Sequence, residues 1–190
     1  PKVLKILKSL SQKCQYKDNF FECEILWGDA REKIKDIPKN IKFDLIYLDG
    51  FSPQKCPQVW SIEFLDKVTQ RLKNNGYLIT YSSSAAIRKT LRELGLYIFN
   101  IKPNKISKNS WSNGTIAIKK MDEESLERNV FFEKLSLMEE EHLLSKASIP
   151  YRDPNLNLNA NDIIQKRFQE QLLSNLKTSK EWREKWGMTK

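Results

Sequence analysis

The sequence predicts an α/β protein whose core is a doubly wound, mostly parallel sheet. Strand-like and helix-like segments alternate along residues 2–118, which is the rhythm of such a sheet. Residues 43–49 (FDLIYLD) form a near-continuous apolar run, the pattern of a strand buried on both faces. The last two strands, at 96–101 and 114–118, are joined by a loop alone, so we expect them to be antiparallel neighbours.

The first part of the chain predicts a helix, a strand and a short helix. Residues 2–13 repeat apolar side chains at a spacing of three and four between lysines, which indicates an amphipathic helix. Residues 20–27 predict a strand and residues 30–37 a short helix. The partner of the strand at 20–27 is open: it can pair with the strand at 43–49 or with another chain.

The middle of the chain continues the alternation. Pro57 suits the first turn of a helix, and Asn75-Gly76 suits the end of one. This crossover is long enough for the strands on either side of it to be parallel neighbours. We expect a helix at 57–74, a strand at 77–81 and a helix at 85–94, followed by the two antiparallel strands.

The composition changes after residue 121. The remaining sequence predicts helices at 122–145, 161–176 and 180–186. A segment of this size buries little by itself. We therefore expect a partial α/β domain at 1–121 and a helical C-terminal extension at 122–190 that packs on it.

The charge of the chain raises the question of a polyanionic partner. Lys and Arg number 33 against 24 Asp and Glu, which gives a formal net charge of +9. A basic surplus favours nucleic acid as a partner. The basic residues are spread from end to end, however, so a protein that is merely rich in lysine is an equal alternative.

Composition also excludes several classes. No apolar run approaches the roughly 20 residues of a membrane helix, and no signal peptide is present, so we expect a cytoplasmic protein. Three cysteines without a CxxC pair predict free thiols and no metal site. A single histidine, His142, argues against zinc chemistry and against a Ser-His-Asp triad. We expect it to be a solvated or half-buried helix residue.

Ligands of open α/β sheets bind beyond the carboxyl ends of the strands. At the first such end, the Asp29 carboxylate can accept a hydrogen bond from an adenine amino group, while the N–H of Ala30 donates to the ring. Alternatively, Asp29 only caps the helix that follows it. Spacing alone leaves both interpretations open.

Two further strand ends carry candidate residues. Asp49 begins the run DGFSP, where its carboxylate can orient an amine nucleophile and Phe51 can stack on a base. The alternative is a strand-to-helix turn in which Asp49 bonds its own backbone. The hydroxyls of Tyr81 and Ser82 can position a substrate, although serine runs more often form loops and caps.

Together these segments resemble the methyltransferase domain of the tRNA 5-methylaminomethyl-2-thiouridine enzymes, the MnmC-like family. The resemblance covers about residues 27–118 and is carried by LIYLDGFSPQKCPQVWSIEFL and NNGYLITYSSSAAIRKTLRELGL. Two positions depart from the family pattern: Gly50 replaces the usual alanine and Cys56 the usual asparagine. The matching positions are Asp49, Phe51, Ser52, Pro53, Pro57, Trp60, Gly76, Leu78, Thr80, Tyr81, Ser82, Arg88, Leu91 and Gly95.

The resemblance implies a Rossmann-like class I methyltransferase sheet and transfer of methyl from S-adenosylmethionine to the aminomethyl group of a wobble uridine in tRNA. It implies a catalytic role for Asp49. It further implies that Asp29, Ala30 and Asp49 bind the cofactor, and that the substrate is bound by Phe51, Ser52, Pro53, Tyr81 and Ser82.

The family's glycine-rich cofactor turn and the acidic residue that binds the ribose have no counterpart in this sequence. Its six glycines form no GxGxxG run. We therefore expect an N-terminally truncated sheet that binds S-adenosylmethionine weakly or not at all. Two hypotheses follow. The chain is part of an enzyme that a missing N-terminal segment or self-association completes, or it is a non-catalytic tRNA-binding or scaffold protein.

Overall fold

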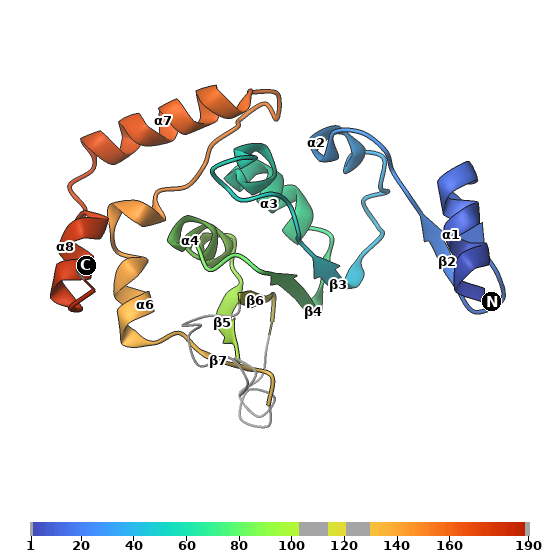
Figure 1. Cartoon of the computed structure of the whole chain (residues 1–190), viewed down its shortest axis with the longest axis horizontal. Coiled ribbons are helices and arrows are strands. Elements are labelled where there is room, and N and C mark those ends of the chain that lie inside the picture. The colour runs from blue at the N-terminus through green and yellow to red at the C-terminus, as the bar shows by residue number, and fades with distance from the viewer. Residues whose placement is uncertain (1, 103–113, 121–129, 189–190) are drawn as a thin grey trace. The chain divides into compact units, whose positions relative to one another are not determined.

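The computed structural model describes residues 2–102, 114–120 and 130–188 (Figure 1). These parts fall into two compact units, Pro1–Ile37 and Pro38–Lys190. The first unit contains α1 (Lys2–Lys13), β1 (Gln15–Lys17), β2 (Glu22–Glu24) and α2 (Ala30–Lys33). The second contains the sheet and the helices that surround it.

The first unit is a helix followed by a small hairpin. The predicted helix at 2–13 is confirmed, and none of its residues is buried. The strand predicted at 20–27 is shortened to β2, which pairs antiparallel with β1 in a separate two-stranded sheet. Asp18 makes this local pairing possible, because its carboxylate accepts hydrogen bonds of 2.8 Å from the N–H groups of Phe20 and Phe21. Such an Asp turn is a short-range signal for a hairpin that our prediction missed.

The second unit is built on a five-stranded sheet in the order β3-β4-β6-β5-β7. The two predicted relationships are confirmed: β3 and β4 are parallel neighbours, and β5 and β6 are antiparallel neighbours. Strand β6 lies between β4 and β5 and is antiparallel to both, and β7 is antiparallel to β5. Among the described strands only β3 and β4 are parallel neighbours, so the sheet is mixed and not mostly parallel as expected. The strands are β3 (Phe43–Tyr47), β4 (Leu72–Thr80), β5 (Tyr97–Ile101), β6 (Thr115–Ile118) and β7 (Phe132–Lys134).

The environment of β3 differs from its prediction. Its apolar sequence indicated burial on both faces, but Leu45 is 42% exposed and Tyr47 is 71% exposed. The reason is its position, because among the described residues β3 pairs with β4 on one side and forms an edge of the sheet. An edge strand lacks the neighbour that would cover the outer half of its side chains.

The single helix predicted at 57–74 is two shorter helices and the start of a strand. A 3-10 turn, η1 (Pro57–Trp60), precedes α3 (Ile62–Thr69), and Ser61 caps α3 by accepting from the N–H of Phe64. Strand β4 then begins at Leu72, which pairs with Phe43. Pairing with β3 overrides the local helical signal, and the expected stop at Gly76 lies inside the strand instead.

The two faces of the sheet have different surroundings. Helices α3 and α4 (Ala85–Glu93) pack on the same side of it (Figure 1). The predicted helix at 85–94 is thus confirmed, and Gly95, with φ +85°, ends it. The opposite face carries an apolar cluster of Phe99, Ile116, Ile118 and Phe132, against which Ile79 and Ile101 pack.

The C-terminal part of the chain belongs to the same compact unit as the sheet. The predicted helices at 161–176 and 180–186 correspond to α7 (Ala160–Leu173) and α8 (Ser179–Lys185). The helix predicted at 122–145 is partly wrong. Residues 121–129 lie outside the described residues. β7 is a strand because it pairs antiparallel with β5, and the rings of Phe132 and Phe99 pack with their centroids 4.8 Å apart. In the described part of this stretch only α6 (Leu137–His142) is α-helical, and a 3-10 turn, η2 (Lys146–Ser148), follows it.

Candidate active site at the ends of two parallel strands

The candidate site begins where β3 ends. Leu48 is buried and its N–H donates to the carbonyl of Ile79, so the pairing with β4 continues one residue past the strand. Asp49 then leaves the sheet with an exposed side chain. Because parallel neighbours end at the same edge of a sheet, Asp49 and Tyr81 emerge side by side.

Two side chains hold the main chain of the DGFSP run in place. The Tyr81 hydroxyl donates a hydrogen bond of 2.8 Å to the Gly50 carbonyl, and the Trp60 indole N–H donates one of 2.7 Å to the Phe51 carbonyl. Trp60 is fully buried, and its ring meets that of Tyr81 edge-on at 6.1 Å. The backbone next to Asp49 is therefore fixed before any ligand binds.

The electrostatics also connect Asp49 with Tyr81. Burial raises the pKa of the Tyr81 hydroxyl, and the negative charge of Asp49 and then the Cys56 thiol add to the increase. Tyr81 consequently stays protonated and remains a donor at neutral pH. The two predicted site residues are thus close enough for their charges to interact.

The other residues of the run differ in accessibility. Phe51 is 78% exposed, although its own carbonyl is tied to Trp60. Ser52 and Pro53 are half-buried, and the Ser52 carbonyl accepts hydrogen bonds from the N–H groups of Lys55 and Cys56 in a tight turn. The exposed ring on a fixed main chain is suited to stacking, because an aromatic face needs no directional partner.

Ser82 faces inward rather than toward solvent. It is 5% exposed, and its hydroxyl accepts a hydrogen bond from the N–H of Ser84 at the start of α4. Its carbonyl accepts one of 2.6 Å from the Thr115 hydroxyl. These contacts match the loop alternative for the serine run, because Ser84, the N-cap of α4, makes no side-chain capping hydrogen bond. A role of Ser82 in substrate binding stays a prediction.

Asp29 and Ala30 lie in the first unit. Asp29 is the N-cap of α2 and accepts from the N–H of Arg31, and its carboxylate also pairs with the Arg31 guanidinium at 2.7 Å. The hydrogen bond from the Arg31 side chain, followed by the main-chain bond, lowers the pKa of Asp29 although burial opposes the change. The capping alternative is therefore present in the structure. The carboxylate remains 46% exposed, so the adenine-binding role stays a prediction.

Sequence reasoning missed three contributors to the site. Trp60 matches the pattern of the resembling family, but its hydrogen bond to the Phe51 carbonyl forms only in the folded chain. Gly114 has φ +119°, and a Cβ atom there would lie 2.4 Å from the Thr80 carbonyl, so β6 approaches the end of β4 closely. Thr115 follows it and bonds Ser82. A glycine before a strand is the only local signal of such close packing.

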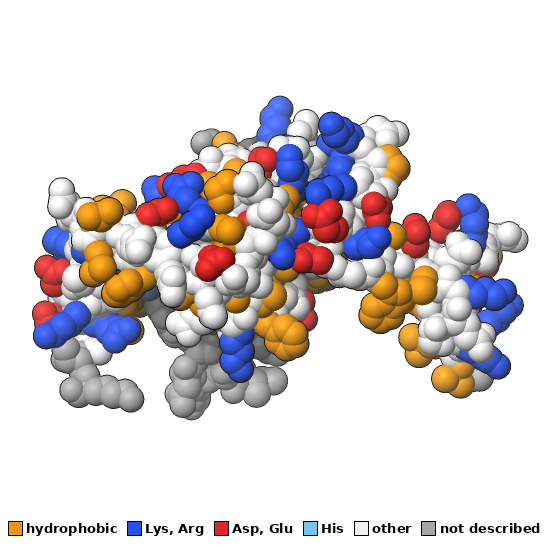
Figure 2. Space-filling model, turned by 90° about the horizontal axis from the view of Figure 1, so that it is seen from above, with side chains coloured by type: hydrophobic (Ala, Val, Ile, Leu, Met, Phe, Trp, Pro, Cys, Tyr) orange, Lys and Arg blue, Asp and Glu red, His pale blue; other side chains and the backbone are white. Residues whose placement is uncertain are grey.

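Charge, metal and membrane features add little to the site. Figure 2 shows basic and acidic side chains interspersed over the face that it displays, with no continuous field of one sign. Within residues 2–102, 114–120 and 130–188, no cluster of three or more His, Cys, Asp or Glu side chains could hold a metal ion. No helix of these segments is long and apolar enough to cross a bilayer. All three cysteines are free thiols.

Comparison with known families decides the class of this arrangement. A family model described as S-adenosyl-L-methionine-dependent methyltransferase matches residues 2–111, which is more than half of the chain. The chain belongs to this methyltransferase family. The Asp49 loop and the strand ends on either side of it fall inside the region that matches the family model.

Individual relatives of this chain support the same assignment. A crystal structure of MNMC2 from Aquifex aeolicus superposes with a TM-score of 0.76 at 28% identity and covers 90% of this chain. An uncharacterized protein of Methanocaldococcus jannaschii is 30% identical over 80% of the chain. The tRNA 5-methylaminomethyl-2-thiouridine biosynthesis bifunctional protein MnmC of Campylobacter hominis is 32% identical over 40% of it.

The chain spans only part of the length of these relatives. It covers 51% of the Aquifex chain, 40% of the Methanocaldococcus protein and 11% of the Campylobacter protein. The TM-score confirms the Rossmann-like α/β fold expected from the resemblance.

Proposed function

We propose that this chain carries the acceptor side of the active site of a tRNA methyltransferase, and that the acceptor is the aminomethyl group of a modified wobble uridine. The observation that supports this proposal best is the placement of Asp49. Its exposed carboxylate follows β3, on a loop that Tyr81 and Trp60 hold by hydrogen bonds, next to the exposed ring of Phe51. The relatives named for MnmC support tRNA as the substrate, and such a substrate implies a cytoplasmic protein.

The chemistry assigns each residue a distinct task. An aminomethyl group is mostly protonated at neutral pH and has no lone pair in that form. The Asp49 carboxylate can accept this proton, which frees the lone pair of the amine, and hold the neutral amine in line for attack. Phe51 can stack on the uracil ring, and Ser52, Pro53, Tyr81 and Ser82 shape the surface around it. Most of the rate increase then comes from positioning.

We propose cofactor contacts for residues of each unit taken by itself. S-adenosylmethionine, when bound, supplies an electrophilic methyl group on a sulfonium. Asp29 and Ala30 would hold the adenine, since the Asp29 carboxylate keeps an exposed side despite its bonds to Arg31. Asp49 would contact the cofactor as well as the amine.

Exchange of Asp49 for Asn tests the proposal in the full protein as its gene encodes it. Asn keeps the shape and one acceptor but removes the charge. We expect Asp49→Asn to lower single-turnover methylation of undermethylated tRNA about 10²-fold. The melting temperature should not change. Asp44→Asn is the matched control, because Asp44 lies on the same strand, is exposed and pairs with Lys73 away from the strand end.

Other outcomes would contradict the proposal in different ways. Equal rates of wild type and Asp49→Asn would remove Asp49 from catalysis and leave it as a turn residue, because Asn is itself a good turn former. Binding of tRNA without methyl transfer by the wild-type protein would favour the second hypothesis, a tRNA-binding or scaffold protein.

A further inference from the structure

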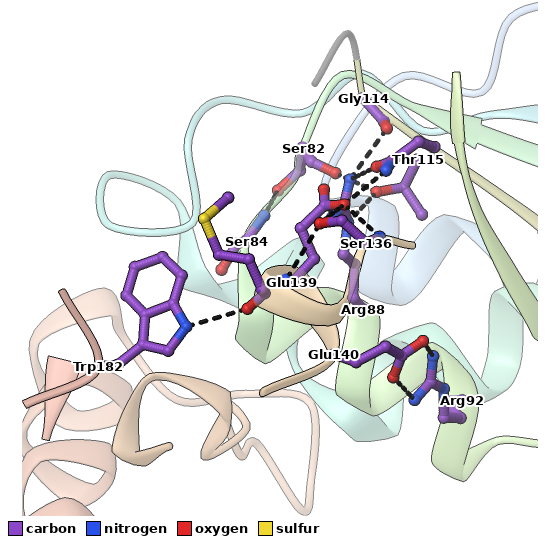
Figure 3. A network of polar contacts seen from close by, with 12 residues as sticks. Ser82, Ser84, Arg88, Arg92, Gly114, Thr115, Ser136, Glu139, Glu140 and Trp182 are labelled. Atoms are coloured by element: carbon purple, nitrogen blue, oxygen red, sulfur yellow. Dashed lines mark hydrogen bonds and ion pairs between the residues drawn. The ribbon is translucent and has the colours of Figure 1, made fainter. Parts of the chain in front are cut away.

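A fully buried ion pair lies behind the candidate site. The Arg88 guanidinium on α4 donates a hydrogen bond of 2.8 Å to the Glu139 carboxylate on α6, and their side chains are 2% and 4% exposed (Figure 3). Burial lowers the pKa of Arg88, whereas the hydrogen bond and charge of Glu139 oppose that change. A buried ion pair is weak evidence of stability, because well-packed apolar residues often stabilise a core as much. The presence of this ion pair therefore needs an explanation other than stability.

Each end of the pair is fixed by further hydrogen bonds. The Glu139 carboxylate accepts from the Asn100 amide at 2.7 Å and from the N–H and hydroxyl of Ser136, with which it forms a capping box. The Arg88 guanidinium also donates to the Asn100 side-chain oxygen at 2.6 Å. The planar guanidinium is thus held in one orientation by partners from α6 and β5.

The remaining donors of Arg88 point toward the end of β4. Its Nε donates to the Thr115 hydroxyl oxygen at 2.9 Å, and one terminal nitrogen donates to the Gly114 carbonyl at 3.2 Å. Because the Thr115 oxygen accepts from Arg88, its single proton is directed to the Ser82 carbonyl at 2.6 Å. Figure 3 shows this sequence of contacts from Glu139 to Ser82.

The end of β4 is where the candidate site is assembled. Ser82 directly follows Tyr81, whose hydroxyl holds the Gly50 carbonyl next to Asp49. Gly114 packs closely against the Thr80 carbonyl and the Tyr81 Cα atom, because a Cβ atom on Gly114 would lie 2.4 Å from the first and 3.0 Å from the second. The contacts of Arg88 therefore reach both sides of the segment that carries Tyr81.

We infer that Arg88 and Thr115 are positioning residues for the proposed methyl transfer. Glu139 of the C-terminal extension holds Arg88, and Arg88 in turn holds Thr115. Thr115 fixes the main chain at Ser82 and thereby the Tyr81 side chain that holds the Asp49 loop. The inference rests on the proposed function for its kinetic consequence, but its structural consequence does not. The C-terminal extension is then a supporting part of the site.

Replacement of Thr115 tests the inference with a matched control. Thr115→Val removes the hydroxyl and keeps the shape, whereas Thr115→Ser keeps the hydroxyl. Thr90→Val is the control, because Thr90 is a buried threonine on α4 whose hydroxyl has no hydrogen-bond partner. The measurements are amide hydrogen exchange of residues 80–84 and steady-state kinetics of tRNA methylation, both on the full protein.

We expect Thr115→Val to speed exchange of the amides at 80–84 about tenfold, since one hydrogen bond is worth about that factor. It should lower kcat about tenfold with KM for tRNA nearly unchanged, because a displaced group slows the reaction more than it weakens binding. Thr115→Ser should restore both values, and Thr90→Val should change neither. A double variant, Arg88→Met with Glu139→Leu, leaves no unpaired charge and should show the same local loosening.

Two results would overturn the inference. Unchanged exchange at 80–84 in a folded Thr115→Val protein would show that the network does not hold this segment. Faster exchange with an unchanged kcat would show that the segment does not position the site. If the wild-type protein transfers no methyl group, the proposed function fails, and the exchange measurement still decides whether Arg88 and Thr115 hold the end of β4.

Discussion

The hydroxyl of Tyr81 and the carbonyl of Gly50 are joined by a hydrogen bond of 2.8 Å, which links the ends of two parallel strands through one side chain. The two residues are 31 positions apart in the sequence. It places a tyrosine whose pKa is raised, and which therefore stays a donor at neutral pH, next to the carboxylate that we propose to be catalytic. This hydrogen bond depends on the parallel pairing of β3 and β4, and its removal tests how the loop is held.

Tyr81→Phe should loosen the loop without unfolding the protein. The lost hydrogen bond lies at the surface, so we expect a loss of at most about 1 kcal/mol in unfolding free energy. Amide hydrogen exchange of residues 50–56 should become faster. Tyr97→Phe serves as the control, because Tyr97 is comparably exposed on β5 and lies on another strand. Equal exchange in both variants would show that Trp60 alone holds the loop.

Gly50→Ala should destabilise this chain, although alanine is usual at the position in the resembling family. A Cβ atom on Gly50 would lie 2.7 Å from the Cγ2 atom of Val59, which is closer than real Cβ contacts. Overpacking of this kind costs about 1–3 kcal/mol. Urea unfolding of Gly50→Ala, Val59→Ala and the double variant checks the explanation. The double variant should be more stable than the sum of the single effects indicates, and strict additivity would contradict it.

The stability of the fold should fall as the pH drops below the ordinary pKa of histidine. His142 stacks on the Trp182 ring at 3.9 Å. Burial lowers the pKa of His142, and the positive charges of Arg183 and Arg88 lower it further. The unfolded chain therefore binds the proton more readily, so stability declines from pH 6.5 downward until the lowered folded pKa is passed.

Melting temperatures between pH 5 and 8 measure this effect. His142→Gln has no titrating group at the position and should show a flatter profile across that window. An identical slope in wild type and variant would show that His142 does not cause the loss of stability in this window.

The 190-residue chain by itself should bind S-adenosylmethionine weakly. Its six glycines include no GxGxxG run, and backbone approach at such a turn normally supports the cofactor. Calorimetric titration of the isolated chain at millimolar cofactor is the measurement. Micromolar binding would show that Asp29, Asp49 and their neighbours suffice, and would contradict this prediction.

Much of the candidate site could be predicted from local sequence. The run DGFSP after an apolar strand located Asp49 and Phe51, and the parallel pairing with the next strand followed from the length of the crossover. Both signals are short in range, because turn residues and strand periodicity depend on neighbours along the chain. The proposed roles of these residues stay predictions that the experiments above address.

Other features could not be predicted, because they depend on contacts between distant segments. The start of β4 at Leu72 is decided by pairing with Phe43, which overrides a helical pattern. The hairpin at Asp18 shows the opposite case, in which a local turn signal was present and a longer strand was expected instead.

The sequence by itself determined the alternation of strands and helices, the antiparallel final strands and the family of this chain, because periodicity and motifs are properties of neighbouring residues. Only the tertiary structure decided that β3 lies at an edge of the sheet that the described residues form, that Trp60 and Tyr81 hold the Asp49 loop, and that Arg88 joins Glu139 to the end of β4. The physical reason is that hydrogen bonds and burial act over distance in space. Arg88 and Glu139 are 51 positions apart in the sequence, and no local pattern indicates that the two side chains meet.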